Sequence, residues 1–450
     1  MRTSLTRLAA VVVVAFVIPR CATAQAFPPG TLRAGAAKVD VTPAALPRNY
    51  TGVLDRIYAR AIVLENGDSR AALISVDATG IPDATWQAVT QQVEQELRIP
   101  SASILLTATH THSVAGQSGS DYVAKIVESV RAAHKALEPA RVGYGTGVSY
   151  INVNRQIIDP ATGRWWEGAN YEGPSDKTVA VLTFVRPNGE PLAVYYNYAV
   201  HGVITGQLDM ISGDIPGAAS RYVEEASGDK VVALWSSGAA GDQNPIYYQQ
   251  TYDLRDIRVK EYARRGVDIS NAMPPGGEGL DRSDPAVARL MNQQKQMVVS
   301  MGQFLGEEVM RVMRGTRRAD GAATLTGAQT TVTCPGRERT NDGRAGFEGS
   351  YRDGNPVEIR LGLLRIGDVV IGAVNAEVFN PIAMRFKAES PIKATMMATL
   401  TNGSARSGYI PDDESYGKYT FEVLSSRLKP GCAESAIVNG LIGLMDARAR

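Results

Sequence analysis

Apolar runs alternate with helical patterns in the first third of the chain. Residues 71–77 and 103–109 are apolar runs typical of buried strands, and residues 83–97 between them repeat apolar positions with the period of a helix. A second helix is predicted over 122–137. A strand, a helix and a strand in this order predict a βαβ unit, whose two parallel strands end at the same edge of the sheet.

The rest of the chain contains hairpin signals and one long helical pattern. We predict two hairpins, 179–185 with 193–200 and 357–366 with 369–374, a strand over 230–235 and a helix over 285–314. The Gly- and Pro-rich segment 271–284 is interpreted as a loop within the same unit. These elements predict a mixed α/β fold, with parallel βαβ units and hairpins in one large domain.

The first 24 residues are predicted to be a cleavable signal peptide. Arg2 and Arg7 precede the apolar run 8–19, and Ala22-Thr23-Ala24 matches a small-residue cleavage site. The apolar run is shorter than the roughly 20 residues that span a bilayer. We therefore expect a mature domain over 25–450, secreted or periplasmic.

Composition narrows the classes of function. The leader carries three arginines and no acid, so its removal changes the formal charge from +1 to −2. This balance gives no electrostatic reason to expect a nucleic-acid partner. The mature chain retains Cys334 and Cys432. The sequence leaves open whether these two cysteines form a disulfide or remain free thiols.

The clearest chemical signal is His110-Thr111-His112, directly after the predicted strand 103–109. Imidazole is the commonest nitrogen ligand of catalytic zinc, and residues two positions apart on an extended segment point to the same side. His201 follows another predicted strand. The sequence therefore predicts a metal site near the ends of these strands.

A series of short motifs extends this pattern along nearly the whole mature chain. They are Ala34-Gly-Ala-Ala-Lys-Val-Asp-Val-Thr-Pro43, Thr107-Ala-Thr-His-Thr-His-Ser113, Asn152-Val-Asn-Arg155, Ala199-Val-His-Gly202, Ser212-Gly-Asp-Ile-Pro-Gly217 and Gly241-Asp-Gln-Asn-Pro245. In these motifs the chain resembles the neutral/alkaline non-lysosomal ceramidase family and its bacterial relatives.

The resemblance implies a mononuclear zinc amidase. Its zinc ligands correspond here to His110, His201, Glu377 and Tyr409, with Tyr416 as an alternative to Tyr409. The implied substrate is a ceramide or another N-acylated lipid, and a lipid substrate implies transient contact with a membrane surface. The sequence does not indicate an oligomeric state.

The residue types also predict a mechanism. Zinc lowers the pKa of bound water to about 7, which makes hydroxide available for attack on an amide or ester carbonyl. His112 is expected to transfer the proton, and Arg155 either stabilises the oxyanion or forms a structural ion pair. Asp77 and Asp242 are expected to orient the metal-binding histidines from behind.

Three departures from the family keep other functions open. Asn244 occupies the position of a serine, and Phe421 that of a substrate-facing tyrosine, for which Tyr419 is a nearby replacement. The chain also ends soon after the predicted site, so we expect no appended β-sandwich domain. The alternatives are a metal-dependent esterase or lactonase with a different substrate, and a non-catalytic secreted binding protein of the same fold.

Overall fold

The computed structural model describes residues 30–114, 118–271, 273–316, 320–341 and 344–446. The predicted signal peptide and its cleavage site lie outside these residues, so export stays a prediction. None of the helices in the described ranges combines the length and apolar character needed to cross a membrane.

The predicted βαβ unit is present in the first of three large sheets, which has the strand order β5-β4-β3-β1-β6. Its strands are β1 Arg33–Asp40, β3 Tyr58–Asn66, β4 Ser69–Val76, β5 Ile104–Ala108 and β6 Glu138–Pro139. Helix α1 (Asp83–Leu97) connects β4 to β5, and these strands pair in parallel, as predicted. Helix α2 (Ser120–Lys135) packs on β1 and β3.

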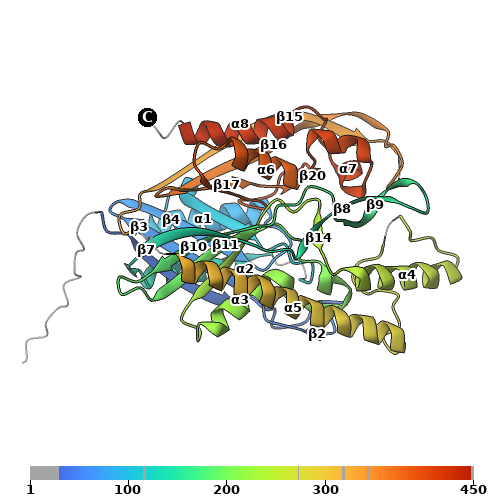
Figure 1. Ribbon diagram of the computed structural model, residues 1–450, viewed down its shortest axis with the longest axis horizontal. Coiled ribbons are helices and arrows are strands. Elements are labelled where there is room, and N and C mark those ends of the chain that lie inside the picture. The colour runs from blue at the N-terminus through green and yellow to red at the C-terminus, as the bar shows by residue number, and fades with distance from the viewer. Residues whose placement is uncertain (1–29, 115–117, 272, 317–319, 342–343, 447–450) are drawn as a thin grey trace, which may run out of the picture.

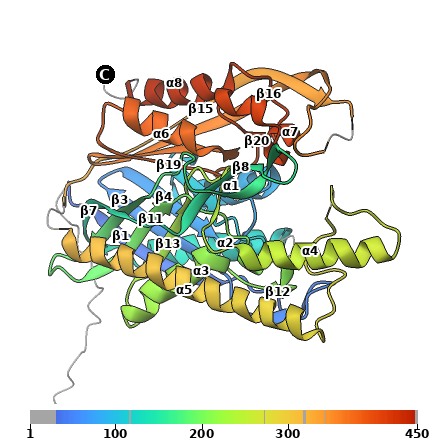
Figure 2. The ribbon, with the colours of Figure 1, turned by 45° about the vertical axis from the view of Figure 1, so that its right-hand side comes forward.

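The second sheet has the order β13-β11-β10-β7 and contains the first predicted hairpin. Its strands are β7 Arg141–Val148, β10 Thr178–Val185, β11 Pro191–Tyr198 and β13 Val232–Ser237. β10 and β11 pair antiparallel, whereas β11 and β13 pair in parallel. Helix α3 (Asp214–Ala226) packs on β13, and the predicted long helix, α5 (Pro285–Gly315), packs on α3 and β7 (Figure 2).

The third sheet has the order β15-β16-β17-β19 and contains the second predicted hairpin. Its strands are β15 Leu325–Arg339, β16 Tyr351–Ile366, β17 Val369–Val374 and β19 Ala394–Ala398. Helices α6 (Asn380–Glu389) and α8 (Ala433–Asp446) lie over this sheet (Figure 1). A disulfide between Cys334 and Cys432 joins β15 to the start of α8.

Short elements surround the ends of these sheets. Two of them are strand pairs, β2 Gly52–Val53 with β12 Met210–Ile211 and β18 Glu377–Val378 with β20 Tyr409–Ile410. A three-stranded sheet consists of β8 Asn152–Asp159, β9 Arg164–Asn170 and β14 Gln243–Pro245. The helices are α4 Gln249–Arg264 and α7 Phe421–Ser425. Segment 271–284 is a loop between α4 and α5 over its described residues, as predicted.

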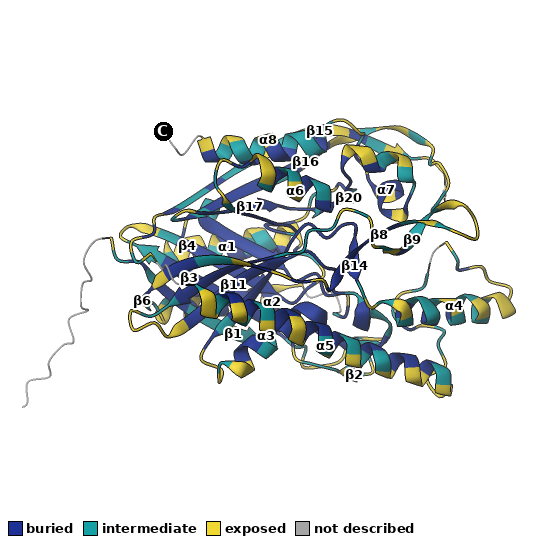
Figure 3. Ribbon diagram, viewed as in Figure 1, coloured by how far each residue is buried: buried dark blue, intermediate teal, exposed yellow. Residues whose placement is uncertain are grey.

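The three large sheets share one hydrophobic core. Leu73 of β4, Leu182 of β10 and Ile371 of β17 belong to the same cluster of buried side chains. The central strands are buried almost throughout, whereas α5 exposes its outer face (Figure 3). The mixed α/β fold expected from the sequence is confirmed.

Candidate metal centre

Three of the four histidines lie together where strands of two different sheets end. His110 comes shortly after β5, and His201 shortly after β11. The ring nitrogens that His110, His112 and His201 offer to a metal lie within 4.8 Å of one another. The Nε2 atoms of His110 and His112 are 3.4 Å apart. The structure therefore brings together the three histidines that the sequence indicated.

The two rings of the His-Thr-His motif converge for a reason that differs from the one predicted. We expected an extended segment, but the backbone of His110 is left-handed, with φ of 64°. A left-handed residue other than glycine costs of order 1 kcal/mol and persists where its surroundings hold it. The His112 N–H donates to the Gly202 carbonyl at 2.8 Å, which ties this turn to the segment that carries His201.

Backbone carbonyls fix the tautomers of two of the histidines. The Nδ1–H of His110 donates to the Thr79 carbonyl oxygen at 2.7 Å, and the Nδ1–H of His201 donates to that of Gln243 at 2.9 Å. A carbonyl oxygen only accepts, so Nδ1 carries the proton in each ring. In the neutral rings Nε2 then holds a lone pair, which is directed toward the cluster.

The prediction that Asp77 and Asp242 orient these histidines is wrong. Asp77 accepts instead from the Tyr58 N–H at 2.8 Å. Asp242 accepts from Asn154 Nδ2 at 2.9 Å and from the Asn380 N–H at 2.8 Å. Both carboxylates hold the scaffold behind the centre, while main-chain oxygens orient the rings.

Glu377 and Tyr409 lie at the same centre on two paired strands. Glu377 Oε1 lies 2.7 Å from His201 Nε2 and 3.2 Å from His110 Nε2. The short strands β18 and β20 pair in parallel, with Glu377 directly opposite Tyr409. Tyr416 lies in neither strand. Register therefore favours Tyr409 as the phenol at this centre.

Charge interactions within the cluster shift the pKa values. Burial alone would raise the pKa of Glu377, but His110 outweighs it and holds that pKa well below its usual value. Burial likewise opposes charge on His110, yet Glu377 raises the His110 pKa. Burial and Arg155 lower the pKa of His201 to about 4, and burial and the other two histidines lower that of His112 well below its ordinary value. The centre is one ionised carboxylate surrounded by imidazoles.

Arg155 is buried beside this centre in a dense set of contacts. Its Nε lies 2.5 Å from Glu422 Oε1, its Nη2 donates to the Gly241 carbonyl at 2.6 Å, and its Nη1 donates to Asn244 Oδ1 at 3.2 Å. Burial raises the pKa of Glu422 to about 7, although the Arg155 charge opposes this. The ion-pair alternative for Arg155 is therefore present, and the pair holds the guanidinium in a fixed orientation.

Two aromatic rings flank the same guanidinium. Its central carbon lies 5.6 Å from the ring centre of Tyr409 and 5.0 Å from that of Phe421. The two rings meet edge to face, 5.8 Å apart, and Phe421 is 38% exposed. Tyr419 lies at the end of the 3-10 helix that precedes α7. Phe421 thus presents a partly exposed apolar surface beside the Arg155 guanidinium.

Asn244 is fully occupied by protein partners. In addition to accepting from Arg155, it donates through Nδ2 to Glu167 Oε1 at 2.9 Å and to Tyr252 Oη at 3.3 Å. Its side chain is buried, and both N–H groups and the carbonyl are used. The residue therefore joins β14, β9 and α4 around Arg155.

A buried hydroxyl chain supports the His112 turn. Thr205 donates both its N–H and its hydroxyl to Asp214 Oδ2, at 2.7 and 2.6 Å. Because the Thr205 hydroxyl proton is used, Ser113 Oγ donates to it at 2.6 Å. Asp214 itself has a positive φ of 51° and is 0% exposed. The buried Asp214 carboxylate thus holds Thr205, and Thr205 in turn holds Ser113, the residue that follows His112.

Sequence reasoning missed Glu422, Glu167 and the pair of Thr205 with Asp214. Glu422 directly follows Phe421, which was singled out, but nothing in the local sequence distinguishes a buried partner of Arg155 from an exposed acid. Asp214 was visible within the motif 212–217, yet its bond to Thr205 depends on the tertiary fold.

Comparison with known proteins places these features in a family. The family model described as "Neutral/alkaline non-lysosomal ceramidase, N-terminal" matches residues 42–337. The neutral ceramidase of Pseudomonas aeruginosa is 28% identical over 280 residues, which cover 52% of this chain and 41% of that protein. Neutral ceramidase B of Dictyostelium discoideum is 28% identical over 257 residues, 47% of this chain and 35% of that protein. The matches thus span well under half of these relatives.

Solved structures agree with the fold. A structure described as a ceramidase complexed with C2 superposes with a TM-score of 0.67 at 18% identity, covering 93% of this chain and 76% of the other. The crystal structure of the neutral ceramidase from Pseudomonas aeruginosa gives a TM-score of 0.65, also at 18% identity, over 93% of this chain and 75% of the other. At this identity the likeness concerns the fold.

Proposed function

Because the chain belongs to the neutral/alkaline non-lysosomal ceramidase family, we propose that it is a zinc-dependent hydrolase that cleaves the amide bond of an N-acylated substrate, a ceramide or a related N-acyl lipid. One observation carries this proposal. The Nε2 atoms of His110 and His201 converge on one oxygen of Glu377, while both Nδ1 atoms are held by carbonyls.

These donor atoms fit a divalent cation. Two imidazole lone pairs and a carboxylate oxygen meet at hydrogen-bond distance, and no proton lies between them when the rings are neutral. Nitrogen and carboxylate ligands from His110, His201 and Glu377, completed by the Tyr409 phenol, form a set that suits zinc. Zinc bound there would act as a Lewis acid and lower the pKa of water.

The remaining residues of the site have distinct proposed roles. His112 lies beside His110 and is outside the proposed ligand set. It therefore accepts a proton from the water that attacks the substrate carbonyl and returns this proton to the leaving amine. Arg155, held by Glu422 and Asn244, presents a fixed positive charge that favours an oxyanion on the substrate carbonyl. The exposed ring of Phe421 contacts an apolar part of the substrate.

Location and substrate are part of the same proposal. We propose that residues 1–24 direct export and that a single domain over 25–450 acts in the periplasm or outside the cell, in transient contact with membrane lipid. Asn244 and Phe421 favour a second candidate, a non-catalytic secreted binding protein of the same fold, because the Asn244 side chain is fully occupied by protein partners and Phe421 presents an apolar ring. A metal-dependent esterase or lactonase would use the same residues on a different carbonyl.

Metal content tests the proposal directly. Elemental mass spectrometry of the mature chain is expected to find about one zinc per chain, lost in His110→Ala/His201→Ala. His134→Ala is the matched control, because this fourth histidine lies on α2, outside the cluster, and its loss should leave zinc unchanged. A folded wild-type protein that takes up no zinc when supplied with it would refute the mechanism.

Turnover then separates the candidate substrates. A panel of ceramides with graded acyl lengths, simpler N-acyl amines, esters and lactones is expected to show faster cleavage of the N-acyl lipids. Faster cleavage of esters or lactones would establish an esterase or lactonase instead. Zinc binding without turnover of any of these carbonyl compounds would favour a binding protein of the same fold.

A further inference from the structure

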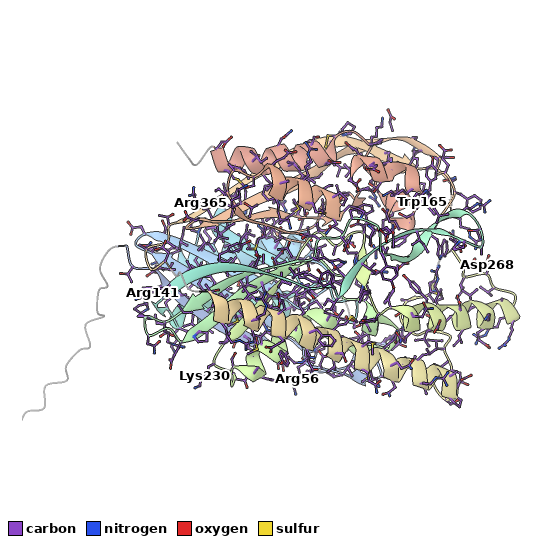
Figure 4. All side chains as sticks on the ribbon, in the orientation of Figure 1. Arg56, Arg141, Trp165, Lys230, Asp268 and Arg365 are labelled. Atoms are coloured by element: carbon purple, nitrogen blue, oxygen red, sulfur yellow. A yellow bond between two sulfur atoms is a disulfide. The ribbon has the colours of Figure 1, made fainter. Side chains whose placement is uncertain are left out.

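A cavity lined by residues of β15 and β16 lies apart from the histidine cluster, none of whose members lines it. It has a volume of about 960 Å³, and Thr331 and Thr333 of β15 line it together with residues of β16. The segments 404–406 and 424–427 also line it. This part of β16 lies toward the end of the molecule where Trp165 is found, away from Arg365 (Figure 4). The volume is that of a small-molecule site.

Arginine dominates the lining of this cavity. Arg337, Arg339, Arg406 and Arg427 all line it, and none of the four forms an ion pair with a carboxylate of the described residues. Arg337 instead donates to two backbone carbonyls, and Arg339 Nη2 is buried without a hydrogen-bond partner. Arg406 and Arg427 are exposed. These four guanidinium groups thus line one cavity without an ion pair to any of the described residues.

The carboxylates of the lining leave most of this charge without a partner. Asp83 is paired with Arg360, and Glu338 is paired with Arg352. Glu358 is the one lining carboxylate without an arginine partner in the part of the chain that the structure describes. Like charges gathered in a concave surface repel one another and focus a positive potential, which an anionic ligand relieves.

We propose that this cavity binds a multivalent anion of the phosphate type, either free phosphate or the phosphate of a lipid head group. Guanidinium groups bind phosphate oxygens through paired N–H donors, and several arginines around one anion are typical of such sites. The hydroxyls of Thr331 and Thr333 in the lining add neutral donors.

Two segments that line the cavity are close along the chain to residues of the candidate metal centre. Asn375 lines the cavity and precedes Glu377 by two residues along the chain. The lining segment 424–427 continues directly from the segment that carries Phe421 and Glu422. An anion bound in the cavity therefore contacts both lining segments and stabilises the adjoining parts of the chain, which carry Glu377 and Phe421.

Binding can be measured without substrate or zinc, so its failure is distinct from failure of the proposed hydrolase. Isothermal titration of the mature chain with pyrophosphate, and flotation with vesicles of phosphatidylglycerol or phosphatidylcholine, test the two sources. We expect saturable, salt-sensitive binding that is weakened about tenfold or more in Arg406→Ala/Arg427→Ala. Arg264→Ala/Arg265→Ala, at the exposed end of α4, is the matched control and should bind as the wild type does.

Each outcome bears on the proposal. Pyrophosphate binding that the cavity variant loses supports a soluble phosphate ligand, and variant-sensitive binding to phosphatidylglycerol vesicles alone supports a lipid head group. Absence of binding to both, or equal weakening in the cavity and α4 variants, overturns the proposal. Because both cavity substitutions are at exposed side chains, thermal unfolding is expected to show that the variant is folded.

Discussion

Asp214→Asn should change how stability depends on pH. The Asp214 carboxylate is 0% exposed and accepts from the N–H and the hydroxyl of Thr205, and it forms no ion pair with a cation of the described residues. Burial raises its pKa from 3.8 to about 6. The folded protein therefore retains a proton on Asp214 over a pH range in which the unfolded chain has lost it.

The sign and size of the effect follow from this shift. Where the folded state binds more protons than the unfolded state, stability falls as pH rises. The shift is about two pK units, and each unit corresponds to 1.36 kcal/mol, so ionisation of Asp214 costs ~3 kcal/mol once the pH exceeds its folded pKa. Of this, ~2 kcal/mol develops between about pH 4.5 and 7. Asparagine is neutral throughout and removes this dependence.

Denaturant unfolding of wild type and Asp214→Asn at these two pH values provides the test. The difference in unfolding free energy between the two proteins should move by ~2 kcal/mol in favour of the variant as the pH rises. Any cost of lost hydrogen bonding is independent of pH and cancels, as does any effect of metal common to both proteins. Asp256→Asn on the surface of α4 controls for loss of a carboxylate. Equal pH dependence in wild type and Asp214→Asn would refute the reasoning.

Three further substitutions test separate parts of the structure. His112→Ala should retain zinc while turnover falls by about 10²–10⁴-fold, and loss of zinc would assign His112 to the ligands instead. Asn244→Ser should lower the free energy of unfolding by about 1–3 kcal/mol in denaturant titration, because serine cannot replace all three hydrogen bonds; an unchanged midpoint would contradict this. Cys334→Ser/Cys432→Ser opens a loop of 98 residues and should cost about 2–5 kcal/mol, measured against the oxidised wild type; equal stability would count against the disulfide.

The elements that were predicted correctly are those with continuous apolar runs or a clear helical period. β4, α1 and β5 lie within two residues of their predicted ranges. β15 was not predicted, because polar residues occupy most of its positions and one of its faces is exposed. Its strand character comes from pairing with β16 along its whole length, which is a tertiary property.

The members of the site were easier to predict than their geometry. His110, His201 and Glu377 follow apolar strands, so their convergence could be inferred from strand ends. The carbonyls that orient the rings belong to Thr79 and Gln243, and a main-chain oxygen has no sequence signature. The left-handed backbone of His110 also has no sequence signature, so it could not be distinguished from an extended strand.

The ends of the three sheets are hydrogen-bonded to one another at the candidate metal centre, and the site therefore depends on the whole fold. Ser237 at the end of β13 donates through Oγ to the Ala108 carbonyl of β5 at 3.2 Å, and it accepts from the Thr399 N–H after β19 at 2.8 Å. One candidate ligand follows each sheet: His110 the first, His201 the second and Glu377 the third. Such a site cannot exist in the unfolded chain, so binding of a metal adds its free energy to that of packing the sheets. The candidate ligands are far apart in the sequence because each of them follows a strand of a different sheet.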